Sequence, residues 1–153
     1  LSGNLFKRGV FQDVDFYQMP IVMEGGSLDS DGQGTLLTTT ECLLSPNRNR
    51  HLGKEDLEQL LMEYFGAKRV LWLEHGFLLG DDTDSHIDML ARFTDPHTIA
   101  YTACSNPEDP HYEALKQMEA QLQSFQTLAG EPYRLVPLEL APSTGADGQR
   151  LPG

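Results

Sequence analysis

The sequence predicts an α/β fold built from two consecutive ββαβ units. Apolar runs typical of strands alternate with helical periodicity, and both halves of the chain show the same order of elements. Matching residues also recur at a nearly constant offset: 62 residues from Cys42 to Cys104, 64 from Gly66 to Gly130, and 65 from Glu74 to Glu139. Such repetition is typical of propeller-like or barrel-like architectures. The alternative is an α+β sandwich in which these spacings are coincidental.

The first unit is expected over residues 20–75. Its elements are, in order, a strand at 21–28, a turn at 29–34, a strand at 35–44, a helix that Gly66 ends, and a strand at 69–74. The turn follows from the run Asp-Ser-Asp-Gly-Gln-Gly. The helix follows from apolar residues that begin at Leu57 and continue at i+3, i+4, i+7 and i+8.

The second unit is expected over residues 84–140. It repeats the order with a strand at 85–93, a turn at 95–97, a strand at 98–104, a helix ended by Gly130, and a strand at 133–140. The helix carries Leu115, Met118, Leu122 and Phe125 on one face. Both units are assigned to one domain that contains residues 1–153.

The net charge of the chain limits the classes of molecule that it is expected to bind. The 153 residues include 11 basic and 23 acidic side chains, which give a formal net charge of −12. This surface repels nucleic-acid backbones and anionic membranes, whereas it attracts small cations. No apolar run approaches the roughly 20 residues of a membrane span, no signal peptide is visible, and two cysteines are too few for a disulfide scaffold. We therefore expect a soluble, cytoplasmic protein.

The ends of the chain suggest a piece of a longer protein. The first residue is Leu1 rather than Met, and residues 141–153 are expected to form a loop with no closing element. Repeat architectures usually need about three units to cover their faces, and only two are present. Unclosed sheet edges would favour self-association, so a homo-oligomer is also expected.

The candidate site centres on Gly80–Asp88, where four aspartates and a histidine fall within nine residues. If this segment ends in a strand, His86 and Asp88 share one face. Glu24 precedes His86 by 62 residues, the repeat offset itself, so the two side chains should converge from neighbouring units. Two carboxylates match the fork of a guanidinium group, and a histidine beside carboxylates suits a general acid. Gly25 and Gly26 would allow close approach to the backbone.

Three other interpretations stay open. The acidic segment can be a solvated, capping turn. His86 with Asp82, Asp84 and Asp88 can ligate a divalent metal in a metal-dependent hydrolase. The chain can also be a non-catalytic module that binds guanidine or polyamine ligands. A nucleophile is not evident, because Cys42 and Cys104 both stand among apolar residues, where cysteine usually acts as a small hydrophobe.

Six motifs resemble those of the agmatine deiminases, which belong to the bacterial-type peptidylarginine deiminase family within the guanidino-group-modifying (pentein) enzymes. In chain order they are Met23–Ser27, Asp31–Thr39, Glu41–Leu44, Asn47–Asn49, Gly80–Asp84 and His86–Asp88. The resemblance runs from about Pro20 to Arg150. It implies a closed five-fold β/α propeller of ββαβ units around a central site, of which this chain supplies two units.

The resemblance also implies an activity. Agmatine would be hydrolysed to N-carbamoylputrescine and ammonia through a cysteine thioether, with no metal or other cofactor. Glu24 and Asp88 match the carboxylates that bind the guanidinium, and His86 matches the proton-transferring histidine. Cys42 matches a family cysteine that is not the nucleophile.

Some features depart from the family pattern. The nucleophilic cysteine belongs to a glycine-rich segment that nothing here matches, so this chain alone is expected not to turn over substrate. An aspartate from an N-terminal unit is also missing. Ser85 and Met89 stand where the family usually has other residues, and both are expected at the edge of the pocket.

Overall fold

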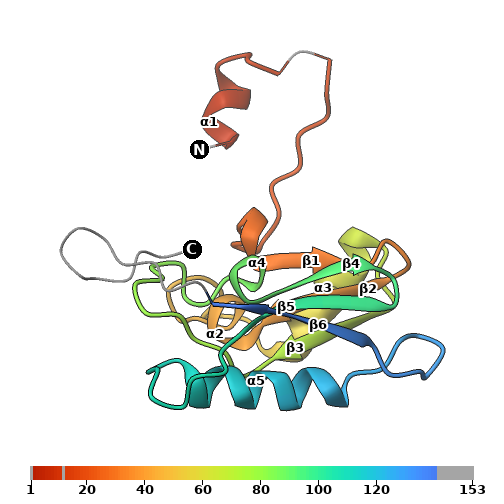
Figure 1. The fold of residues 1–153 in the computed structure, drawn as a ribbon. Coiled ribbons are helices and arrows are strands. Elements are labelled where there is room, and N and C mark those ends of the chain that lie inside the picture. The colour runs from red at the N-terminus through yellow and green to blue at the C-terminus, as the bar shows by residue number, and fades with distance from the viewer. Residues whose placement is uncertain (1, 12, 141–153) are drawn as a thin grey trace.

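Two three-stranded sheets form the body of the molecule in a computed structural model that describes residues 2–11 and 13–140 (Figure 1). The loop expected at 141–153 lies outside the described residues. In the first unit β1 (Leu28–Ser30) pairs antiparallel with β2 (Thr35–Thr39), which pairs parallel with β3 (Arg69–Leu73). Between β2 and β3 the chain forms two helices, α2 (Thr40–Leu43) and α3 (Lys54–Phe65).

The second unit has the same topology. β4 (Ala91–Asp95) pairs antiparallel with β5 (Thr98–Ala103), which pairs parallel with β6 (Arg134–Glu139) after the crossover helix α5 (Tyr112–Ser124). The order and direction of the strands are identical in both sheets. This arrangement confirms the predicted α/β repeat of two ββαβ units.

The first strand of each unit is shorter than predicted, because a helical turn precedes it. The turn η1 (Gly25–Ser27) comes before β1, and α4 (Ile87–Leu90) comes before β4. The prediction of strands at 21–28 and 85–93 was therefore wrong for most of these residues. Ile87 and Leu90 are both buried at a spacing of three residues, which is typical of a helix and not of the alternation expected for a strand.

Two further boundaries differ from the prediction. The second strand ends at Thr39, whose Oγ1 accepts a hydrogen bond from the backbone N–H of Cys42 and caps α2, so Cys42 lies on a helix. Helix α3 ends at Gly66 as predicted, with a left-handed φ of 63°. Helix α5 ends at Ser124 rather than at Gly130, which instead forms a turn with Thr127.

A shared core joins the two units. The larger apolar cluster combines Leu37 and Leu73 of the first unit with Leu115, Met118 and Leu122 of α5. Helix α5 runs along one side of the sheets (Figure 1) and contacts β3 as well as β5. The Gln121 side chain accepts a hydrogen bond from Glu74 N (2.8 Å) and donates one to Trp72 O (2.9 Å). The second unit's helix thus covers the last strand of the first.

Asn49 fixes the segment that leads to the candidate site. Its buried side chain accepts from Val22 N (2.9 Å) and donates to Val22 O (2.9 Å) and Leu43 O (3.0 Å). We expect Asn49→Ala to lower the free energy of unfolding by roughly 1–3 kcal/mol, because it removes these bonds and leaves the buried Leu43 carbonyl without this donor. Urea denaturation measures the effect. The exposed Asn47→Ala is the control, and equal stability of the two variants would contradict this role.

Candidate functional site

Glu24 and His86 meet at the boundary between the two units, as predicted. The Nε2 of His86 lies 2.8 Å from Oε2 of Glu24, although the residues are 62 positions apart. The His86 side chain is 13% exposed, whereas that of Glu24 is 43% exposed. Glu24 therefore keeps a free side for a ligand, while His86 is held in place.

Asp88 completes the trio through its contact with Gly26. A Cβ atom at Gly26 would lie 2.5 Å from His86 Nδ1 and 2.6 Å from Asp88 Oδ2. Both side chains consequently press against this one glycine. The expected strand alternation is not the reason, because His86 directly precedes α4 and Asp88 lies within this helix. The start of helix α4, and not the alternation of a strand, brings His86 and Asp88 together.

Arg48 links the trio to the acidic segment. Its Nε donates to both oxygens of Glu24 (2.9 and 3.1 Å), and its Nη2 donates to the Thr83 carbonyl (3.0 Å). Its Nη1 pairs with the carboxylate of Asp84. The sequence indicated Asn47–Asn49 only as a motif and predicted no contact for Arg48, so this link was missed. An arginine within a conspicuous Asn-Arg-Asn run of an acidic chain was the available signal.

The loop before His86 is shaped by Asp81. Its carboxylate accepts from Thr83 N (2.9 Å) and Ser85 N (2.8 Å), so part of the predicted acidic cluster has a capping role. Asp84 and Ser85 both take left-handed backbone conformations, with φ of 60° and 59°. Such conformations are strained for residues other than glycine. The Ser85 carbonyl accepts from Thr39 Oγ1 at 2.8 Å, which ties this loop to the first unit.

The charges of the site keep Glu24 ionised. The hydrogen bond from His86 lowers the pKa of Glu24 below its ordinary 4.5, burial opposes this shift, and the bonds from Arg48 reinforce it. Burial raises the pKa of the Cys42 thiol to about 11, the charge of Arg48 opposes this rise, and the charge of Glu24 adds to it. Cys42 is fully buried and stays protonated at neutral pH. These properties agree with its assignment as a packing residue rather than a nucleophile.

Only one of the residues predicted to ligate a metal, His86, lies in a group that is close enough to hold an ion. Within residues 2–11 and 13–140, the side chains close enough to ligate one ion are Glu24, Cys42 and His86, whose ligand atoms lie within 4.8 Å of one another. The predicted partners Asp82, Asp84 and Asp88 do not join this group. Arg48 also donates to both carboxylate oxygens of Glu24.

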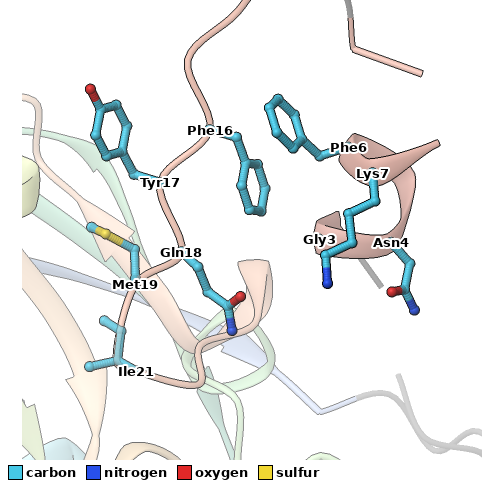
Figure 2. A pocket seen from close by; sticks show the side chains of 9 residues that line it. All are labelled: Gly3, Asn4, Phe6, Lys7, Phe16, Tyr17, Gln18, Met19 and Ile21. Carbon is cyan, nitrogen blue, oxygen red and sulfur yellow. The ribbon is translucent and has the colours of Figure 1, made fainter. Parts of the chain in front are cut away.

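Glu24 borders a cavity of about 420 Å³. Its lining includes Met23, Leu28, Asp29 and Phe65. A larger cavity of about 740 Å³ lies elsewhere, between α1 (Ser2–Lys7) and residues 16–21 (Figure 2). There the rings of Phe6 and Phe16 stack with centroids 4.8 Å apart. Because α1 projects from the body (Figure 1), this second cavity is separate from the trio.

Comparison with known proteins shows the family to which the chain belongs. Residues 2–153 match the Porphyromonas-type peptidyl-arginine deiminases. The chain belongs to this family. No helix in the described part of this deiminase-family chain is both long and apolar enough to cross a membrane.

Individual relatives agree with the assignment. A Legionella pneumophila protein grouped by name with the agmatine deiminases is 40% identical over 99% of the chain, which spans 42% of that protein. A C. jejuni agmatine deiminase with substrate bound has a TM-score of 0.84 at 40% identity, over 98% of this chain and 43% of that one. An Enterococcus faecalis agmatine deiminase gives a TM-score of 0.76 at 34% identity, over 90% and 37% of the two chains. The chain thus spans about two fifths of these relatives.

Proposed function

We propose that this chain supplies part of the guanidine-binding site of an agmatine deiminase. The complete protein would hydrolyse agmatine to N-carbamoylputrescine and ammonia. The observation that carries the proposal is the convergence of Glu24, His86 and Asp88 around Gly26, at the boundary between two units. Residues 1–153 would then form part of a single domain, a five-fold propeller of which residues 20–75 and 84–140 are two units.

The site residues divide the chemistry among them. The carboxylates of Glu24 and Asp88 would hold the planar guanidinium by charge-assisted hydrogen bonds. A cysteine thiolate from outside this chain would attack the guanidinium carbon, and the bond from that carbon to one terminal nitrogen would break. His86 would protonate the departing nitrogen so that it leaves as ammonia. Water would then attack the same carbon and cleave the carbon–sulfur bond, which releases N-carbamoylputrescine and regenerates the thiol.

Agmatine is favoured over peptidyl-arginine as substrate. The motif run from Asp31 to Asn49 resembles that of agmatine deiminases, and the relatives described above carry that name. The strong negative charge of the chain also suits agmatine, which is a small dication.

A metal-dependent hydrolase is the second candidate, and the grouping of Glu24, Cys42 and His86 is the observation that favours it. It requires the buried thiol of Cys42 to lose its proton and Arg48 to release Glu24. Both requirements make it the weaker candidate.

The test is ammonia release from agmatine by the complete polypeptide that contains this segment. We expect turnover of agmatine, none of a peptidyl-arginine substrate, no loss of activity with a chelator, and no turnover by the 153-residue chain alone. Activity that a chelator abolishes and zinc restores would favour the second candidate. Saturable agmatine binding without any ammonia release would instead indicate a non-catalytic binding module.

A further inference from the structure

We propose that Arg48 is the positioning residue that joins the two units at the guanidine site and fixes the geometry of Glu24 and His86 together. This inference deepens the proposed function and rests on it. It assigns Arg48 no contact with the reacting atoms.

The guanidinium group of Arg48 contacts residues on both sides of the unit boundary. On the side of the first unit, Nε approaches both oxygens of Glu24 at 2.9 and 3.1 Å. On the side of the second unit, Nη2 donates to Thr83 O at 3.0 Å and Nη1 pairs with Asp84. The Arg48 side chain is 11% exposed, while those of Glu24 and Asp84 are each 43% exposed. The arginine therefore lies beneath the two carboxylates, which leaves their outer side open.

Arg48 contacts the loop at and next to two residues with left-handed backbone conformations. Asp84 and Ser85 are strained, and such conformations persist only where surrounding contacts determine them. Arg48 holds the residue before this pair by its carbonyl and the first member by its carboxylate. His86 follows directly, and its backbone N–H donates to Thr83 Oγ1 at 3.2 Å. The position of His86 therefore depends on Arg48 through the contacts of Thr83 and Asp84.

Charge alone does not account for the arrangement. A lysine would keep the positive charge between Glu24 and Asp84, but its single nitrogen cannot reach both carboxylates and the Thr83 carbonyl in a fixed plane. Arg48→Lys therefore separates positioning from simple neutralisation. Arg92→Lys is the control, because the Nε of Arg92 also pairs with a carboxylate across the unit boundary, Asp29 Oδ1 at 3.1 Å, and this pair includes none of Glu24, His86 and Asp88.

The experiment compares both variants in the complete polypeptide. For Arg48→Lys we expect kcat/KM for agmatine to fall about 100-fold, the usual result of misplacing reacting groups by about 1 Å. We also expect amide hydrogen exchange in residues 81–86 to become roughly tenfold faster, because local opening of that loop becomes easier. Arg92→Lys should change neither quantity.

The two readouts separate the inference from the function on which it rests. If wild-type protein does not process agmatine, the proposed function fails, while exchange in residues 81–86 still reports whether Arg48 holds the loop. If Arg48→Lys keeps both wild-type activity and wild-type exchange, positive charge is sufficient and the positioning role is overturned. Faster exchange with unchanged activity would limit Arg48 to a structural role and equally overturn it.

Discussion

Gly26→Ala is expected to remove at least about 99% of the deiminase activity while leaving the fold intact, because a misplacement of about 1 Å at reacting groups costs on the order of 100-fold. The added methyl group would lie 2.5 Å from His86 Nδ1 and 2.6 Å from Asp88 Oδ2. Atoms cannot remain that close, so at least one of the two side chains must move. Steady-state kinetics with agmatine measures the loss.

The neighbouring glycine provides the control. A Cβ atom at Gly25 would meet nothing within 4 Å. Gly25→Ala should therefore keep activity within about twofold of the wild type, as substitutions without new contacts usually do. Circular dichroism and thermal melting of both variants would establish that each is folded. A folded Gly26→Ala variant with normal kcat/KM would show that the close packing of His86 and Asp88 is not required.

Glu24→Gln is expected to weaken agmatine binding by the complete polypeptide roughly 10- to 100-fold, because charge-assisted hydrogen bonds contribute about 1.5–3 kcal/mol. The glutamine keeps the size of the side chain but loses its charge. Titration calorimetry measures the affinity. Glu63→Gln, an exposed position on α3, is the charge-matched control and should bind agmatine like the wild type.

The pH dependence of binding gives the same prediction a second readout. The pKa of Glu24 is lowered from 4.5, chiefly by the hydrogen bond from His86. The carboxylate therefore stays ionised as pH falls through 4.5, and its contribution to binding is lost only when pH falls through the lowered value. Wild-type affinity should hold to below pH 4.5, whereas Glu24→Gln should lack this acid limb. An acid limb that persists in the variant would assign the titration to another group.

The sequence predicted the repeat correctly because hydrophobic periodicity and turn residues are local signals. The helix that ends at Gly66 and the strand at Arg69–Leu73 both follow from residues within one short window. The offset of 62 residues between Glu24 and His86 was equally visible and predicted their meeting, which the structure confirms.

The errors arose where short polar side chains compete with the strand backbone. Thr39 caps α2 and ends the second strand early, and Asp81 bends the loop before α4. Arg48 was missed for a different reason. Its partners Glu24 and Asp84 lie 24 and 36 residues away, and no local pattern reveals contacts over such distances. The catalytic roles of Glu24, His86 and Asp88 remain predictions for the experiments above.

The hydrogen bonds of Gln121 have a consequence for how such a chain can be assembled. Because the helix of the second unit covers the final strand of the first, the first unit depends on its successor for this cover. A unit cannot be excised or exchanged without exposing the strand that it shields. Duplication of the whole ββαβ segment preserves this dependence at each new junction, so the architecture favours growth by tandem copying over shuffling of single units.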